Sequence, residues 1–183
     1  MSIWDGWGDY RLSERGLQQA EAAARWLSFE RLGRVVSSDV PRTIQTAQCL
    51  MNMGNVECPM MYCEPNLRPW NVSTEFTGKE KTPEMIARFK PYLDDLTKVI
   101  EGGESGQQLC QRVQVIWQYI CAPYKGLPTA CFIHNSVIKA LMGLLTIRDA
   151  VDPGGIIGVY MDEKGEIDFQ VLLGETNFEK GVS

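Results

Sequence analysis

Short β-branched segments alternate with amphipathic helical segments along this chain, and this alternation restricts its fold more than any other feature. Apolar residues recur at helical spacing in five segments: 17–29, 41–54, 83–92, 109–120 and 137–145. Short segments rich in strand-forming side chains lie between them: 34–38, 60–63 and 130–133. Strands separated by helices predict a three-layer α/β/α sandwich in which the sheet is mostly parallel.

Local signals refine this expectation at both ends of the chain. Residues 158–161 and 167–171 flank a polar turn, which predicts a late antiparallel hairpin. Ser13 is placed to cap the first helix through its hydroxyl, and either Ser38 or Asp39 is placed to cap the second.

Length and charge bound the classes of protein that the chain can represent. Its 183 residues fit a single domain that spans residues 1–183. The formal net charge of −5 argues against a nucleic-acid partner, which would require a basic face. There is no apolar run of the roughly 20 residues that span a bilayer and no signal peptide, so we expect a cytoplasmic protein without a membrane partner. The oligomeric state is open.

The cysteines and the histidine argue against a bound metal. The six cysteines form no C-x-x-C pair, and a single histidine cannot supply a histidine-rich set of ligands. We therefore expect no metal site and no cofactor. Reduced thiols fit the cytoplasmic setting.

The only histidine, His134, lies between a predicted strand and a helix that begins with Asn135 and Ser136. Ligands of α/β proteins bind beyond the carboxyl ends of the strands, and the start of a helix offers free backbone N–H groups to an anion. His134 is therefore a candidate for a catalytic or anion-binding role. The alternative is a histidine that caps the helix or packs in the core.

Arg42 is a second candidate, because it lies in the first turn of a helix that follows a strand. Its planar guanidinium can hold a phosphate through two parallel hydrogen bonds. The alternative is a solvated arginine, although a positive charge in a first helical turn opposes the helix dipole.

The chain resembles the histidine phosphatase superfamily, also called the phosphoglycerate mutase-like family, from about Trp4 to Leu145. Segments similar to family motifs occur in the family's order: residues 12–20, 37–47, 102–105 and the strand that leads to His134. The resemblance implies a phosphoglycerate mutase-like sandwich and a phosphomonoester phosphatase that works without a metal. It also implies a phosphorylated small molecule or phosphate as the partner.

The resemblance further implies roles for particular residues. In the family, a histidine in an N-terminal Arg-His-Gly motif attacks the phosphomonoester, and water then hydrolyses the phosphohistidine. By position, Arg42 and His134 match the second arginine and the second histidine, which bind the phosphoryl oxygens. Asn135 stands where the family usually has glycine. Its backbone N–H is expected to face the phosphate, while its side chain narrows the pocket.

Two carboxylates have roles that the sequence leaves open. Pro69 occupies the usual position of the general acid, so Glu75 in the same loop, residues 67–79, is the nearest candidate. The alternative for Glu75 is an exposed loop carboxylate. Glu104 either favours the start of a helix through its charge or orients pocket residues.

The sequence departs from the family pattern at its start, because residues 1–183 do not contain the Arg-His-Gly motif. We expect an N-terminally truncated domain that lacks the nucleophile and is inactive as a phosphatase. The family's first strand is interior, so its absence would leave two neighbouring strands with open edges. Three explanations stand: a longer natural protein, a pseudoenzyme whose sheet closes or borrows a strand, or a segment Met1–Trp4 that covers the gap.

Three functions follow from these alternatives. The chain is a phosphatase active only in a longer form, or a phosphate-binding pseudoenzyme, or a protein-interaction module. The last would use an exposed surface of Trp4, Trp7 and Trp70, because exposed aromatic residues favour interfaces.

Overall fold

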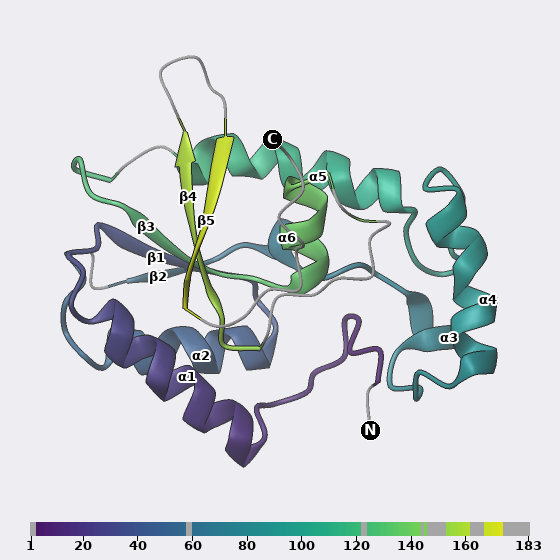
Figure 1. Cartoon of the computed structure of the whole chain (residues 1–183), viewed down its shortest axis with the longest axis horizontal. Helices are drawn as coiled ribbons and strands as arrows, with labels where there is room; N and C mark the ends of the chain where they lie inside the picture. Colours follow the sequence, from purple (N-terminus) through teal and green to yellow (C-terminus); the bar gives the residue numbers. More distant parts are fainter. Residues whose placement is uncertain are drawn as a thin grey trace.

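A parallel sheet lies at the centre of the fold (Figure 1). The structure is a computed structural model that describes residues 3–57, 60–121, 124–143, 145, 153–161 and 167–173. The strands of this sheet are β1 (Arg34–Ser37), β2 (Met61–Cys63) and β3 (Thr129–Phe132), in the order β2-β1-β3. Val35 of β1 pairs with Met61 on one side and with Ala130 on the other. The predicted strands and their parallel pairing are confirmed.

Helices cover the sheet on both sides. The described part of the chain contains these α-helices: α1 (Glu14–Leu27), α2 (Pro41–Met51), α3 (Ser73–Phe76), α4 (Pro83–Asp94), α5 (Gly106–Cys121) and α6 (Asn135–Leu141). A 3-10 turn, η1 (Pro65–Leu67), precedes α3. Figure 1 shows α1 and α2 along one side of the sheet and α5 and α6 along the other. No helix among the described residues is long and apolar enough to cross a membrane.

Two neighbouring side chains of β1 show why both faces must be covered. Successive side chains of a strand point to opposite faces. Val35 packs with Ala47 and Leu50 of α2, whereas Val36 packs in a larger core with Val113 of α5. Both valines are buried. The three-layer α/β/α architecture is thereby confirmed.

The helix caps agree with the prediction at α1 and differ at α2. The Ser13 hydroxyl accepts a hydrogen bond from the Gly16 N–H at 3.1 Å, as expected. The N-cap of α2 is Val40, which has no side-chain cap, so the predicted cap by Ser38 or Asp39 is wrong. Asp39 forms an ion pair with Arg68 instead, and the Ser38 hydroxyl contacts His134. Both partners are far away in the sequence, and local spacing does not reveal them.

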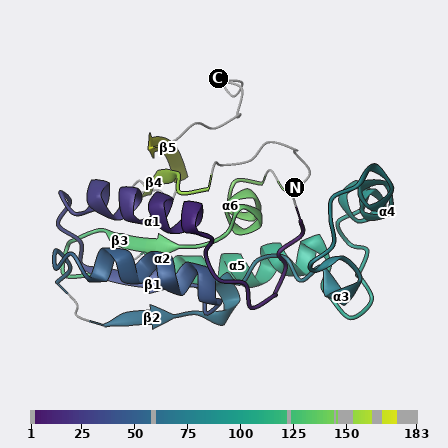
Figure 2. The ribbon, with the colours of Figure 1, turned by 90° about the horizontal axis from the view of Figure 1, so that it is seen from below.

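The late hairpin forms a separate sheet. Strands β4 (Ile156–Met161) and β5 (Ile167–Leu173) pair with each other in antiparallel fashion, which confirms the prediction. The expected turn at residues 162–165 lies outside the described residues. Figure 2 shows β4 and β5 beyond β3, on the side of the sheet away from β2. Among the described strands, β3 pairs only with β1, and β4 only with β5.

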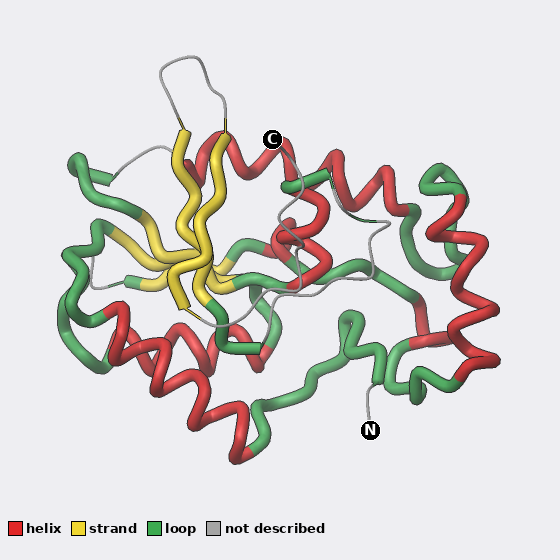
Figure 3. Tube along the Cα trace, viewed as in Figure 1, coloured by secondary structure: helices red, strands yellow, loops and turns green. Residues whose placement is uncertain are grey.

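The start of the chain lies elsewhere. Ile3 forms a bridge with Glu80 and Trp4 forms one with Thr77, next to α3 and α4 (Figure 1). The idea that this segment covers the open edge of β3 is therefore wrong for the residues that the structure describes. Among the described strands, β3 is an edge strand of one sheet and β4 of the other, and Figure 3 draws the strands of both sheets in yellow.

Candidate active site

His134 and Arg42 meet at the carboxyl edge of the parallel sheet. His134 follows β3 and is the N-cap residue of α6, and Arg42 is the second residue of α2, which follows β1. Because β1 and β3 are parallel neighbours, the chain leaves both at the same edge. The two side chains line one cavity of about 280 Å³. The structure thus brings together the two residues that the sequence analysis singled out.

The imidazole of His134 contacts the residue that immediately follows β1. Its Nε2 lies 2.9 Å from the hydroxyl of Ser38, which is fully buried. Burial, and then the positive charges of Arg42 and Arg112, hold the pKa of His134 well below its ordinary value of 6.5. The ring is therefore neutral near pH 7, and Nδ1 is the nitrogen that Ser38 leaves unused.

Arg42 binds the loop that precedes α1. Its guanidinium donates to the carbonyls of Gly8 at 3.1 Å and Gly6 at 3.0 Å. Two N–H groups are used in this way, which leaves the others of the five for a ligand. Desolvation lowers the pKa of Arg42, and the charge of Asp5 opposes this shift. An arginine remains charged under these conditions, so Arg42 supplies a fixed positive charge to the cavity.

Asn135, which the sequence also singles out as a phosphate-binding candidate, lines this cavity as well. Glu75, the candidate for the general acid, does not belong to the described lining of the cavity. Asn135 begins α6 and is exposed. Glu75 lies on α3, where its carboxylate accepts a hydrogen bond from Arg88 of α4 at 2.6 Å. Asp5 is the carboxyl group in the described lining of the cavity. Sequence reasoning did not single it out, because a loop residue before the first helix carries no periodic signal.

Glu104 contacts the loop beside the cavity and helix α5, as the orienting role that the sequence left open would require. Its carboxylate accepts hydrogen bonds from Arg112 at 2.7 and 2.9 Å and from the Asn71 N–H at 2.8 Å. Its carbonyl accepts a hydrogen bond from the Trp70 indole at 2.9 Å. The Glu104 and Arg112 side chains are only 13% and 16% exposed, so the pair is shielded from water.

Arg112 is the residue of this cluster that sequence reasoning missed. It also donates to the carbonyls of Asn66 at 2.6 Å and Pro69 at 2.8 Å. Arg112 therefore ties α5 to the loop that leads to Trp70. Arg112 is only eight positions from Glu104, and this spacing could have suggested their ion pair. The contacts of Arg112 with Asn66 and Pro69 could not be predicted, because they depend on the folded path of the chain.

The expected tryptophan surface is not present as proposed. Trp70 is buried, with 5% of its surface exposed, and packs edge-on against Phe89 with ring centres 5.3 Å apart. Trp4 is half-buried and packs against the same Phe89 ring at 5.6 Å. Trp7 is 39% exposed. The prediction of a surface of exposed tryptophans is therefore wrong for Trp70, which packs in the core.

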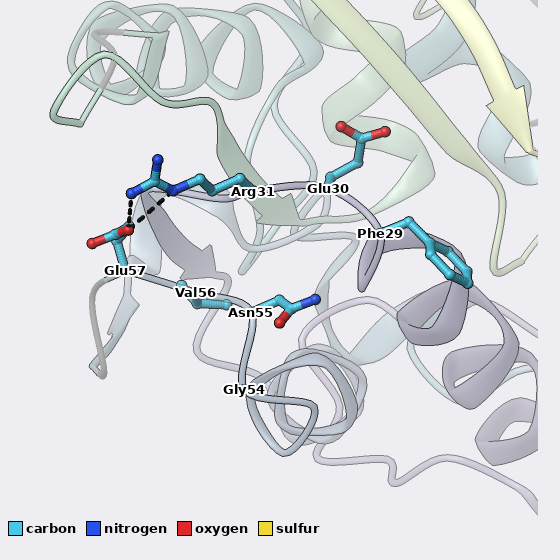
Figure 4. A pocket seen from close by; sticks show the side chains of 7 residues that line it. All are labelled: Phe29, Glu30, Arg31, Gly54, Asn55, Val56 and Glu57. Carbon is cyan, nitrogen blue, oxygen red and sulfur yellow. Dashed lines mark hydrogen bonds and ion pairs between the residues drawn. The ribbon is translucent and has the colours of Figure 1, made fainter.

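A second cavity, of about 510 Å³, lies at the other end of the sheet (Figure 4). It is lined by residues 29–31 and 54–57, which precede β1 and β2. Figure 4 shows the Arg31–Glu57 ion pair on one side and Phe29 pointing away from the pair. Phe29 is 89% exposed. This hollow opens at the amino ends of the strands, where α/β sheets do not usually bind ligands.

The site is cationic and holds no recognisable metal cluster. Among the charged residues that line it, Arg42, Lys81 and Lys139 outnumber Asp5. Within the described ranges, no group of three or more histidine, cysteine, aspartate or glutamate residues is placed to hold a metal ion.

Fold and site together define an α/β protein with a positively charged cavity at the carboxyl edge of a parallel sheet. Residues 2–153 match the family model of the histidine phosphatase superfamily (branch 1). The chain belongs to this superfamily.

The chain is also similar to parts of two longer relatives. The chain is 33% identical over 152 residues to the metal-independent phosphoserine phosphatase of Arabidopsis thaliana, which covers 80% of this chain and 62% of the relative. It is 31% identical over 115 residues to the fructose-2,6-bisphosphatase TIGAR of Xenopus laevis, which covers 62% of this chain and 41% of the relative. The chain thus spans less than two thirds of either relative.

Solved structures share the fold. A mycobacterial glucosyl-3-phosphoglycerate phosphatase in complex with inorganic phosphate superposes with a TM-score of 0.76 at 20% identity, over 94% of this chain and 91% of that one. The α-ribazole phosphatase from Shigella flexneri superposes with a TM-score of 0.74 at 17% identity, over 93% of this chain and 87% of that one.

Proposed function

We propose that the chain forms the phosphoryl-binding part of a phosphomonoester phosphatase that works through a phosphohistidine. The observation that carries this proposal is the convergence of Arg42, His134 and Asn135 on one cavity at the carboxyl edge of β1 and β3. Arg42 supplies positive charge, and the neutral imidazole and the Asn135 backbone N–H supply hydrogen bonds to the phosphoryl oxygens. Family membership supports this assignment.

The nucleophile in this proposal is a histidine outside residues 1–183, because the single histidine of the chain is His134. A segment that ends in Arg-His-Gly would add one strand between β3 and β4, whose edges are open in the described sheets. Its imidazole would attack phosphorus and displace the alkoxide, and water would then release phosphate. His134 would remain a binding group throughout.

The proton for the leaving group comes from a carboxyl group in this mechanism. Glu75 is the candidate by its place in the sequence, and Asp5 is the candidate by its place in the cavity. Asp5→Asn and Glu75→Gln in an active, extended form separate the two. The substitution that removes the acid slows an alkyl phosphate far more than para-nitrophenyl phosphate, whose leaving group needs little protonation.

The proposed substrate is a small phosphorylated molecule. The cavity of about 280 Å³ is near the lower end of ligand sites. The names of the relatives, a phosphoserine phosphatase and a fructose-2,6-bisphosphatase, agree with this size class. A cytoplasmic location also belongs to the proposal, because Cys49, Cys63, Cys110 and Cys131 are free thiols.

A second candidate function is phosphate binding without turnover. It is favoured by the presence of a single histidine in the 183 residues. In this case Arg42 and His134 would bind a phosphorylated metabolite and release it unchanged.

The test compares hydrolysis of para-nitrophenyl phosphate by the 183-residue chain and by a form extended with the coding sequence upstream of Met1. Activity in the extended form alone supports the phosphatase. Phosphate binding without turnover in both forms supports the binding protein. Turnover by the short chain would contradict the assignment of an external nucleophile and make His134 the residue to replace.

A further inference from the structure

Ser136 lines the same cavity as Arg42 and His134. Ser136 is the second residue of α6 and is partly exposed. It belongs to the cavity lining together with the two proposed phosphate-binding side chains. A polar side chain at this place can contact a ligand that Arg42 and His134 bind.

The hydrogen bonds of Ser136 leave its proton available. A serine hydroxyl has one donor and two acceptor positions. The Ser136 oxygen accepts a hydrogen bond from the Trp70 backbone N–H at 3.0 Å. In the part of the chain that the structure describes, no protein group accepts the Ser136 proton. The hydroxyl therefore retains a hydrogen-bond donor for which the described residues supply no acceptor.

The group that orients Ser136 is itself firmly held. Trp70 is buried, and its indole N–H donates to the Glu104 carbonyl at 2.9 Å. The following residue, Asn71, donates its N–H to the Glu104 carboxylate, which is paired with Arg112. Arg112 also binds the Pro69 carbonyl, immediately before Trp70. The backbone N–H that meets Ser136 thus has little freedom to move.

We propose that Ser136 is a ligand-binding residue whose hydroxyl donates a hydrogen bond to a phosphoryl oxygen bound between Arg42 and His134. Glu104 and Arg112 act as positioning residues, because they hold Trp70 against Ser136. This inference rests on the proposed phosphate-binding function. The inference adds the uncharged Ser136 hydroxyl to the phosphate-binding groups. The positions of Arg42 and His134 do not by themselves predict this hydrogen-bond donor.

The single histidine makes the test direct. Its imidazole signals in a ¹⁵N-labelled sample are assigned without further work, and they report on inorganic phosphate added to the folded chain. The dissociation constant is measured for the wild type, Ser136→Ala and Ser136→Thr. A hydrogen bond to a charged group predicts roughly ten-fold weaker binding in Ser136→Ala. Ser136→Thr, which keeps the hydroxyl, is expected to bind close to the wild type.

A matched pair of arginines tests the positioning role. Arg112→Met removes the hydrogen bonds that hold residues 66–70, and it is expected to weaken phosphate binding. Arg34→Met is the control. Arg34 donates to Tyr119 and Ile120 carbonyls of the same helix, but it lies at the opposite end of β1. It is expected to lower stability without a change in phosphate affinity, and urea unfolding checks that each variant is folded.

The outcomes separate this inference from the proposed function. Absence of phosphate binding by the wild type would overturn both. Wild-type binding with an unchanged constant in Ser136→Ala would overturn the Ser136 assignment alone. An equal loss of affinity in Arg112→Met and Arg34→Met would overturn the positioning role, because it would show a general effect of destabilisation.

Discussion

The Nε2 atom of His134 lies 2.9 Å from the hydroxyl of Ser38, and this contact links the ends of the two parallel strands that carry the site. Ser38 immediately follows β1, and His134 is separated from the end of β3 by one residue. Because Ser38 is fully buried, it cannot reach a substrate, so it orients the imidazole and is not itself a nucleophile. The orientation of the ring is thereby fixed.

The burial of His134 predicts that stability falls in mildly acidic solution. Its pKa is well below 6.5 in the folded chain, so the unfolded chain binds a proton more readily between these two values. The free energy of unfolding is therefore highest above about pH 6.5, and it decreases as the pH falls from there toward the folded pKa. The limiting slope is about 1.4 kcal/mol per pH unit.

Urea unfolding at pH 7.5 and pH 5.5 measures this effect, with His134→Gln as the control. The variant should lose most of the pH dependence in this window. Arg68 holds the pKa of Asp39 below its ordinary 3.8, so that group acts only at lower pH. Equal pH dependence in the wild type and in His134→Gln would contradict a neutral imidazole whose pKa is lowered in the folded chain.

Ser73 is held in a conformation that favours glycine. Its φ is +60°, in the left-handed region that L-residues rarely adopt. Ser73→Gly should raise the free energy of unfolding by roughly 0.5–1 kcal/mol in urea unfolding. Ser28→Gly is the control with the opposite sign. Ser28 has an ordinary φ of −66°, so the variant gains no relief of strain, and it loses chain rigidity and the hydrogen bond from the Ser28 hydroxyl to the Arg25 carbonyl. A lower stability for Ser73→Gly would show that its hydroxyl outweighs the strain.

Gly103 allows the segment before α5 to approach the loop that carries Asn71. A Cβ at Gly103 would lie 2.4 Å from the Asn71 carbonyl oxygen, so the backbone would have to shift. Gly103→Ala should lower the unfolding free energy by about 1–3 kcal/mol, and it should weaken phosphate binding through the neighbouring Trp70. Gly54→Ala adds backbone strain at φ +80° without a clash, and its phosphate affinity should be unchanged. If the phosphate affinity is unchanged in Gly103→Ala as well as in Gly54→Ala, the loop that carries Asn71 does not influence phosphate binding.

The shielded Glu104–Arg112 pair predicts an asymmetric response to substitution. Arg112→Met leaves a carboxylate with little access to water and should cost about 3–5 kcal/mol of stability. Glu104→Gln combined with Arg112→Met removes both charges, so the double variant should be more stable than Arg112→Met alone. Thermal unfolding of the two variants and the wild type measures this. A double variant that is less stable than Arg112→Met would contradict this account. It would show that the Glu104 carboxylate is still compensated when Arg112 is replaced.

The layers of the fold could be predicted from the sequence because they depend on local periodicity. The apolar spacing along α1 and α5 and the short strand at residues 34–37 identify the elements without knowledge of their partners. The Ser13 cap has the same local origin. The α2 cap was mispredicted because Asp39 forms an ion pair at 2.6 Å with Arg68, which is 29 positions away.

The candidate site was only partly predictable for the same reason. Arg42 and His134 follow strands, and parallel strands bring their carboxyl ends together, so the convergence of these two residues follows from the topology. Asp5 lies in a loop whose path has no periodic signal. Ser136 of α6 and Arg112 of α5 lie on helices, but their contacts with Trp70 and Pro69 join positions far apart in the sequence, which local spacing does not reveal. Glu75 resembles an acid by its position, yet α3 directs it to Arg88.

The most direct test of the account is a phosphate titration that monitors the imidazole signals of His134 near pH 7. The account predicts a saturable shift in the wild type and in Arg31→Ala, whose exposed ion pair lies at the other end of the sheet. It predicts that the shift is lost in folded Arg42→Ala. No saturable shift in the wild type, or the same affinity in Arg42→Ala, would contradict a phosphoryl site between Arg42 and His134.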